Sequence, residues 1–81
     1  MIYVATFFSH FGAMQYKKTC DRTGIPARMM PVPRMLSSSC GTCVRVETDA
    51  PDRLPRTEET EQLALALSDG SYSVFWRAEN S

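Results

Sequence analysis

The distribution of apolar and polar residues along the chain predicts alternating strands and helices. Residues 2–8 are β-branched or aromatic and contain no breaker, which is typical of a buried strand. The next segment, "HFGAMQYKKTCDRTG", places apolar residues on one side at helical spacing. Ser9 is suited to cap the start of this helix and Gly24 to end it. We therefore expect a first strand followed by a first helix.

Two further strands are expected on either side of a serine-rich loop. "PARMMPVP", residues 26–33, predicts a second strand, although Pro31 and Pro33 lack the N–H that a strand ladder needs. These prolines confine that end to a sheet edge or to a departure from the sheet. "TCVRVE", residues 42–47, alternates as a third strand would, and a polar, proline-bearing connection follows over residues 48–56.

The C-terminal third predicts a second helix and a fourth strand. Three glutamates, Glu58, Glu59 and Glu61, add negative charge to the first turn of a segment that runs from Thr57 to Gly70. Its apolar stripe at helical spacing consists of Leu63, Ala66 and Leu67. "SYSVFWRA", residues 71–78, alternates as a strand with Tyr72, Val74 and Trp76 on one face.

The order strand, helix, strand, strand, helix, strand is that of the split βαβ, or ferredoxin-like, α+β fold. In that fold both helices cover one face of a four-stranded antiparallel sheet, and the other face stays open. Ile2, Phe8 and Phe75 are available for the open face. Because large apolar patches are uncommon on monomers, this face predicts a homodimer or a docked partner.

Size and charge narrow the class of protein. The 81 residues, 43% hydrophobic and 22% charged, predict a single globular domain over residues 1–81 with a thin core. Nine basic and nine acidic residues cancel, so no overall field would attract nucleic acid or an anionic membrane. The apolar N-terminal segment is much shorter than the ~20 residues of a membrane-spanning helix and lacks a basic leader. We expect a cytoplasmic protein that binds neither nucleic acid nor membrane.

The three cysteines point to reduced thiols, since their number is odd and no export signal is evident. "CGTC" pairs Cys40 with Cys43, a spacing used for dithiol redox work or for half of a zinc site. In an extended chain these residues lie about 10 Å apart, beyond the ~7 Å limit for a disulfide, so a bridge would require a turn between them. A zinc site would have to add Cys20 and His10 from the first helix, which is poor geometry, and we expect no metal.

Cys40 differs from the other two cysteines because its neighbours are small, hydrogen-bonding and conformationally free. Backbone N–H groups in a glycine-containing turn can bind an anion, and serine hydroxyls add donors, so the thiolate could be favoured without a helix. The expected anion-stabilising residues are Arg34, Ser37, Ser38, Ser39 and Gly41. His10 is a candidate base, because imidazole titrates near neutrality. The alternative is that "SSSCG" is only a mobile connection.

The stretch "GIPARMMPVPRMLSSSCG", residues 24–41, resembles a family of small prokaryotic proteins described as selenium/sulfur carrier-like. The resemblance rests on the glycine, the strand, "PVPR", the serine-rich loop and the Cys-Gly pair, and extends more weakly to the N-terminal strand and to a helix containing Ala13. It implies that Cys40 carries sulfur or selenium as a persulfide or selenosulfide, received from a donor protein and passed to an acceptor protein. Cys43 stands where a small apolar residue is expected, so it could resolve a persulfide or fill that apolar site. The motif positions that match are Pro31, Pro33, Arg34, Ser37, Ser39 and Gly41.

A carrier thiolate must attack a donor's persulfide sulfur, hold the outer sulfur and then yield it to an acceptor nucleophile. This chemistry needs exposure and a thiolate fraction more than it needs a substrate pocket. The sequence therefore favours a sulfur or selenium carrier without a cofactor over an enzyme. Two alternatives stay open: a thiol redox switch through Cys40 and Cys43, and an interaction or regulatory module whose open sheet face binds a partner.

Overall fold

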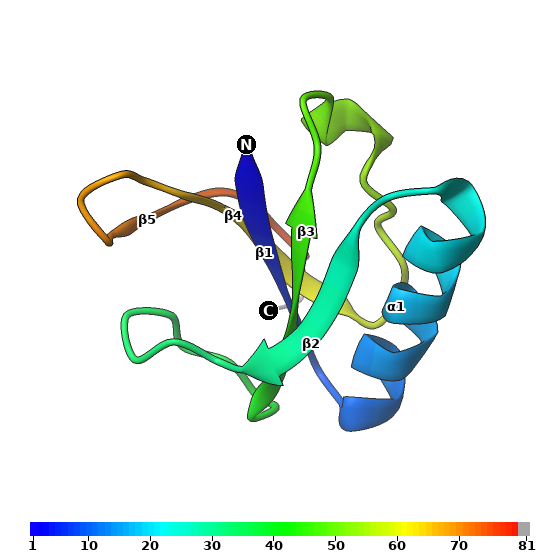
Figure 1. Cartoon of the computed structure of the whole chain (residues 1–81). Helices are drawn as coiled ribbons and strands as arrows, with labels where there is room; N and C mark the ends of the chain where they lie inside the picture. The colour runs from blue at the N-terminus through cyan, green and yellow to red at the C-terminus, as the bar shows by residue number, and fades with distance from the viewer. Residues whose placement is uncertain (80–81) are drawn as a thin grey trace.

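A computed structural model of the chain describes residues 1–79 as an α+β fold with one α-helix and a five-stranded antiparallel sheet (Figure 1). The strands lie in the order β2-β3-β1-β4-β5, so the N-terminal strand is at the centre. The elements are β1 (Ile2–Phe7), α1 (His10–Thr23), β2 (Ala27–Pro31), β3 (Thr42–Glu47), the 3₁₀ turn η1 (Pro51–Arg53), β4 (Thr60–Ala66) and β5 (Tyr72–Arg77).

The ferredoxin-like arrangement expected from the sequence is wrong, because the segment expected as the second helix forms strand β4. Its alanine, leucine, glutamate and glutamine residues favour a helix locally, but Leu63, Leu65 and Leu67 also recur at every second position, as in a strand. In the fold this segment pairs with β1 on one side and with β5 on the other. Pairing on both sides satisfies its backbone groups, so tertiary context overrides helix propensity.

Helix α1 has the caps that the sequence predicted. The Oγ of Ser9 accepts a hydrogen bond from the Gly12 N–H at 3.1 Å and lies 2.5 Å from a carboxylate oxygen of Glu59. Gly24 ends the helix in the left-handed conformation, with φ 78°, which glycine adopts without strain. The helix has 14 residues and is too short and too polar to cross a membrane, and residues 1–79 contain no other α-helix.

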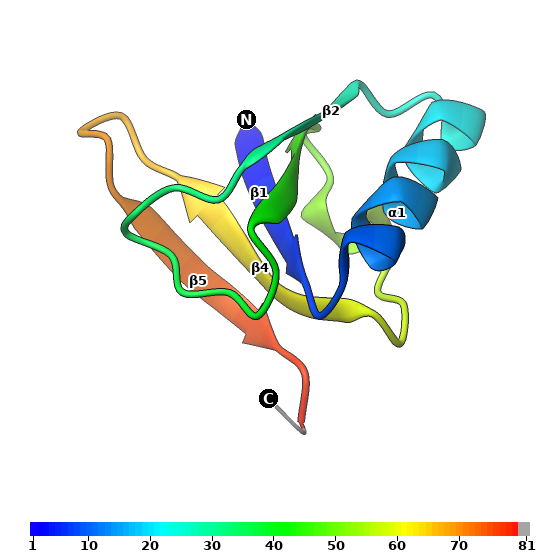
Figure 2. The same cartoon turned by 90° about the horizontal axis from the view of Figure 1, so that it is seen from below.

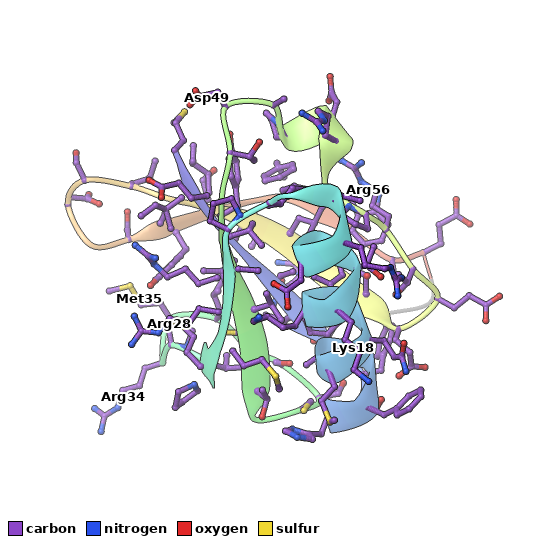
Figure 3. All side chains as sticks on the ribbon, turned by 45° about the vertical axis from the view of Figure 1, so that its right-hand side comes forward. Lys18, Arg28, Arg34, Met35, Asp49 and Arg56 are labelled. Atoms are coloured by element: carbon purple, nitrogen blue, oxygen red, sulfur yellow. The ribbon has the colours of Figure 1, made fainter. Side chains whose placement is uncertain are left out.

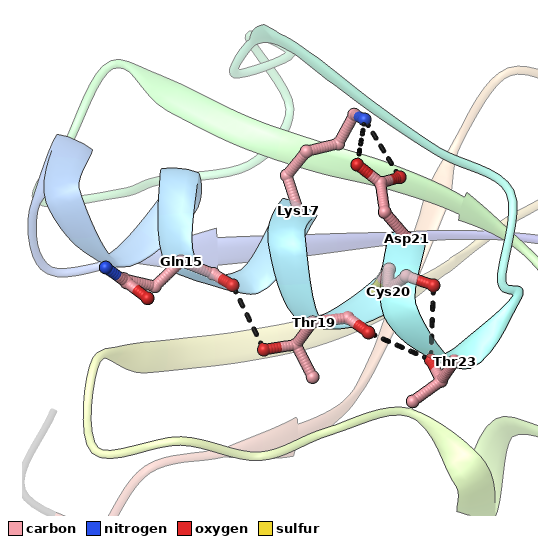
Figure 4. A network of polar contacts seen from close by, with 6 residues as sticks. All are labelled: Gln15, Lys17, Thr19, Cys20, Asp21 and Thr23. Atoms are coloured by element: carbon pink, nitrogen blue, oxygen red, sulfur yellow. Dashed lines mark hydrogen bonds and ion pairs between the residues drawn. The ribbon is translucent and has the colours of Figure 1, made fainter.

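The solvent side of α1 carries its own polar contacts, which Figure 4 shows. The Nζ of Lys17 lies 2.7 and 2.9 Å from the two carboxylate oxygens of Asp21, one turn further along. The hydroxyls of Thr19 and Thr23 donate to carbonyls one turn earlier, at 3.1 and 3.0 Å. The opposite side of the helix, with Ala13, Tyr16 and Cys20 buried, packs on the sheet.

We call the sheet surface under α1 the helix face; α1 lies over β1, β2 and β3 there (Figures 1 and 2). The connection after β3 extends this cover, because Leu54 is buried and the Arg56 guanidinium lies 5.7 Å from the centre of the Trp76 ring. The core of this face comprises Tyr3, Ala5, Phe7, Ala13, Tyr16, Cys20, Ile25, Val44, Val46, Leu54 and Leu63.

The opposite surface, the loop face, is covered in part by the connection between β2 and β3, whereas the sequence left it open. We call residues 32–41 the Cys40 loop; it leaves β2 and passes across the sheet before it returns to β3 (Figure 2). The Val32 N–H donates to the Gly41 carbonyl at 3.1 Å and closes the neck of the loop. Leu36 is buried in a cluster with Val4, Cys43 and Ala64. Burial of a leucine side chain contributes about 2 kcal/mol to the stability of the fold.

Phe75, one of the residues expected on an open face, instead lies on the helix face, where its ring meets Tyr3 edge-on at 5.7 Å between centres. The proposed dimer surface therefore loses one of its three expected members. Since the loop fills part of the same face from within the chain, the structure gives no support to a homodimer formed there.

Candidate functional site

Cys40 is partly exposed and lies two residues before β3, where the Cys40 loop turns back to the sheet. Its Sγ accepts a hydrogen bond from the Thr42 N–H at 3.4 Å. Its own N–H donates to the Ser38 Oγ at 3.2 Å, so the chain is turned around the thiol. A backbone N–H directed at the sulfur stabilises negative charge there, which is a requirement for a nucleophilic thiol.

The three serines of the loop hold it to the sheet. The Ser39 N–H and hydroxyl both donate to the Glu61 carboxylate, the hydroxyl at 2.8 Å. The Ser38 hydroxyl donates to the Phe7 carbonyl at 3.3 Å, and the Ser37 carbonyl accepts from the Gln62 amide at 2.7 Å. The hydroxyls of Ser38 and Ser39, expected around the thiolate, are therefore directed toward β1 and β4, and Ser37 meets β4 through its carbonyl.

Glu61 is the site residue that the sequence analysis missed, because it placed Glu61 in the first turn of a helix. Its carboxylate accepts hydrogen bonds from Ser39 and, at 3.1 Å, from the hydroxyl of Thr6 on β1. The leucines that alternate in "LALAL" after Glu61 were a signal for a strand, and a strand would have placed this carboxylate on the sheet.

A β-bulge brings two neighbouring side chains of β4 to the same loop. Thr6 pairs with Gln62 and Phe7 pairs with Thr60, so Glu61 is the extra residue between them. A bulge interrupts the alternation of side chains between the two faces and re-aims one of them. Glu61 and Gln62 therefore both reach the Cys40 loop, on Ser39 and Ser37 respectively.

The hydrogen bonds at Glu61 fix its charge. Partial burial by itself would raise the pKa of Glu61, but the hydrogen bonds that it accepts outweigh burial and lower the pKa below its usual range. The Ser38 hydroxyl donates its one proton to the Phe7 carbonyl, so we ascribe the lowered pKa of Glu61 to the hydrogen bonds from Ser39 and Thr6. At neutral pH Glu61 is a carboxylate.

Glu61→Gln is expected to cost about 1 kcal/mol of folding free energy near neutral pH, as for loss of a partly exposed charged hydrogen bond. Because the folded pKa lies below the unfolded value of about 4.3, this contribution is complete above the unfolded pKa and disappears as pH falls through the folded pKa. Urea unfolding of both proteins between pH 7 and about pH 3 tests it. Glu58→Gln, at an exposed glutamate nearby, is the matched control. A difference that stays constant down to the lowest pH would contradict the assignment.

The loop also borders a polar hollow of about 290 Å³. Its wall consists of Ser37, Ser38, Ser39, Glu61, Gln62 and Arg77. Cys40 is not part of this wall. The partly exposed thiol therefore lies outside this hollow.

The other two cysteines are buried on opposite faces of the sheet, and all three thiols are free. Cys43 lies on the loop face, where its S–H donates to the Pro31 carbonyl at 3.6 Å. Burial, together with the nearby Cys40, raises the pKa of Cys43 to about 11. On the helix face, burial and the neighbouring Asp21 raise the pKa of Cys20 to about 11. Both are neutral thiols near pH 7.

The candidate base His10 lies close to this site without touching Cys40. It is exposed at the start of α1, and its Nδ1 is 3.1 Å from the Oγ1 of Thr42, whose N–H binds the Cys40 sulfur. Arg34 is exposed and its side chain reaches outward from the molecule, as Figure 3 shows. His10 is thus linked to the thiol through Thr42, whereas Arg34 extends into solvent.

The four residues considered as zinc ligands do not converge. Cys20 is on the helix face and Cys43 on the loop face, so the sheet separates them. Within residues 1–79, no group of three or more His, Cys, Asp or Glu side chains is arranged to hold a metal ion.

Comparison with known protein families gives a match over most of the chain. The family model described as "Putative Se/S carrier protein-like" matches residues 2–66, which run from β1 through β4 and include the Cys40 loop and Glu61. No curated protein and no solved structure matches the chain.

Proposed function

The chain belongs to the Se/S carrier protein-like family, and from this premise we propose that it carries a single sulfur or selenium atom on Cys40 between a donor and an acceptor protein. The observation that carries the proposal is the contrast among the three thiols. Cys40 is partly exposed and accepts a backbone N–H, whereas Cys20 and Cys43 are buried and have raised pKa values.

Loading exchanges one S–S bond for another. The Cys40 thiolate attacks the outer sulfur of a donor persulfide, a new S–S bond forms, and the donor thiolate leaves with the electron pair of the broken bond. Delivery repeats the exchange, with an acceptor nucleophile attacking the outer sulfur and Cys40 leaving as the thiolate. Selenium follows the same path when it replaces the outer sulfur. No external oxidant or reductant enters either step.

The arrangement around Cys40 suits transfer between proteins. The thiol lies outside the polar hollow, in a loop that runs over the sheet surface, so a donor's cysteine can approach it directly. The Thr42 N–H is already directed at the sulfur and can stabilise the thiolate that leaves during delivery. His10, bonded to the Thr42 hydroxyl, is the nearest candidate to accept the thiol proton.

The two alternative functions are less well supported. A dithiol switch needs Cys43 to reach Cys40, but Cys43 is fully buried and its S–H is bonded to the Pro31 carbonyl. An interaction module without thiol chemistry was based on an open sheet face, which the Cys40 loop covers in part.

Intact-mass measurement after incubation with inorganic polysulfide, or with selenite activated by glutathione, tests the proposal. We expect a gain of about 32 Da for one sulfur or about 79 Da for one selenium atom, with reversal by excess thiol. A loss of about 2 Da, a disulfide, would favour the switch, and an unchanged mass with both donors would favour the module.

A further inference from the structure

The Cys40 loop covers Cys43 as well as presenting Cys40. Cys43, the second residue of β3, lies on the loop face and has no exposed surface. Leu36, the one buried residue of the loop, packs in the same cluster. Met35, its neighbour, is 69% exposed and adds nothing to this cover. Access to Cys43 therefore depends on where the loop lies.

Three polar ties hold the loop to the central strands of the sheet. Ser39 binds Glu61, Ser37 binds Gln62, and Ser38 binds the Phe7 carbonyl, at distances from 2.7 to 3.3 Å. All three ties are made to β1 and to the start of β4, while both ends of the loop arise from the edge pair β2 and β3. A segment with so few buried apolar contacts belongs to the part of a protein that opens most readily.

We propose that the Cys40 loop is a hinged cover, that Glu61 and Gln62 are its latch, and that opening the cover makes Cys43 a second reactive thiol beside Cys40. The neck formed by Val32 and Gly41 is the hinge, since its backbone hydrogen bond pairs the two ends of the loop and involves none of the residues of the three ties. Breaking the latch leaves the sheet and α1 in place, because none of the three ties belongs to a strand ladder.

The cover has a consequence for a loaded carrier, and this part rests on the proposed function. A thiolate at Cys43 can attack the inner sulfur of the Cys40 persulfide, form a Cys40–Cys43 disulfide and expel the outer sulfur as hydrosulfide with the electron pair of the broken bond. The Cys43 sulfur is oxidised, the Cys40 sulfur stays at the disulfide level, and the carried sulfur is reduced to hydrosulfide. A closed cover prevents this loss, so the latch protects the cargo until an acceptor receives it.

The test compares alkylation of Cys43 with alkylation of Cys20. Cys20 is an internal control, because it is equally buried, has a pKa raised to about 11 like that of Cys43, and lies on the opposite face. In Glu61→Gln we expect iodoacetamide to modify Cys43 about tenfold faster than in the unaltered protein, the factor for one charged hydrogen bond. The Cys20 rate should rise only by as much as the loss of global stability accounts for, and by less than the Cys43 rate. An unchanged Cys43 rate, or a parallel rise at both cysteines, would overturn the proposal.

Two further variants separate the effect of the latch on the Cys43 alkylation rate from the effects of charge and of global stability. Ser39→Ala keeps the Glu61 charge and removes one donor, so it should raise the Cys43 rate by a smaller factor in the same direction. Glu58→Gln removes a charge outside the latch and should leave both rates unaltered. If Glu61→Gln raises the alkylation rate of Cys43 and Ser39→Ala does not, the effect is electrostatic and the proposal that the loop is a hinged cover is wrong.

A second measurement addresses the cargo. Polysulfide-loaded Glu61→Gln should release sulfide faster than the loaded unaltered protein, and Cys43→Ala introduced into that variant should abolish the excess. If the protein takes up no sulfur, the proposed function is wrong, while the alkylation rates still show whether the loop controls access to Cys43. If it loads but the excess release survives Cys43→Ala, the role given to Cys43 fails.

Discussion

Replacing Cys40 with serine is expected to abolish sulfur and selenium loading and to leave the fold intact. A serine hydroxyl can still accept the Thr42 N–H, and the side chain is partly exposed, so little packing is lost. It cannot supply the thiolate that attacks the donor. Intact mass after incubation with polysulfide measures loading, and circular dichroism with urea unfolding measures the fold.

Cys43→Ala is the matched control for this variant. It should load like the unaltered protein but lose about 1 kcal/mol of stability, since a fully buried small side chain is truncated in a thin core. If Cys40→Ser still gained the mass of one sulfur, or if Cys43→Ala were the variant that failed to load, Cys40 would not be the carrier residue.

The second large effect is the difference in reactivity among the three thiols. At pH 7 iodoacetamide should modify Cys40 more than about 100-fold faster than Cys20 or Cys43, because the thiolate is the reactive form and burial suppresses it. With pKa values raised to about 11, the two buried thiols are almost wholly protonated at pH 7, and their rates should rise about tenfold per pH unit up to that value.

Timed quenching followed by peptide mapping gives these rates. Trypsin cleaves after Arg34 and Arg45, so Cys40 and Cys43 share one peptide and fragment ions between them must be used. Cys20 lies in a separate peptide and serves as the buried reference. Equal rates at Cys40 and Cys43 near neutral pH would remove the basis for choosing Cys40.

Much of the fold follows from local sequence signals, because those signals agree with the tertiary structure. Ser9 and Gly24 cap α1 as expected, and strand alternation predicted β3 and β5 close to their observed bounds. Pro31 ends β2, as the missing N–H of proline requires. A serine-rich loop carrying Cys40 was also expected between β2 and β3.

The prediction of a second helix was wrong because the structure of that segment depends on pairing with strands distant in the sequence. "TEQLALAL" satisfies both a helical stripe and a strand alternation, and only its pairing with β1 and β5 decides between them. The bulge at Glu61 follows from the register of that pairing and has no local signature. The alternating leucines could have indicated the strand, but the contact of Glu61 with the Cys40 loop depends on this bulge and could not be found from the sequence.

The residues that donate hydrogen bonds around Cys40 also differ from those expected from the sequence. Ser37, Ser38 and Ser39 were assigned to the thiolate because short polar residues beside a thiol offer it donors. In the fold their polar groups meet Gln62, Phe7 and Glu61 instead, and the donor at the Cys40 sulfur is the Thr42 N–H. The participation of Arg34 and Gly41 in anion binding stays a prediction.

The most direct test of the proposed carrier function is to locate the added atom. Protein incubated with polysulfide is trapped with iodoacetamide and digested, and the fragment ions of the peptide between Arg34 and Arg45 are recorded. We predict an excess of about 32 Da at Cys40, beyond the alkyl group, and none at Cys43 or Cys20. An excess at Cys43 with Cys40 unloaded, or no excess at any cysteine, would contradict it.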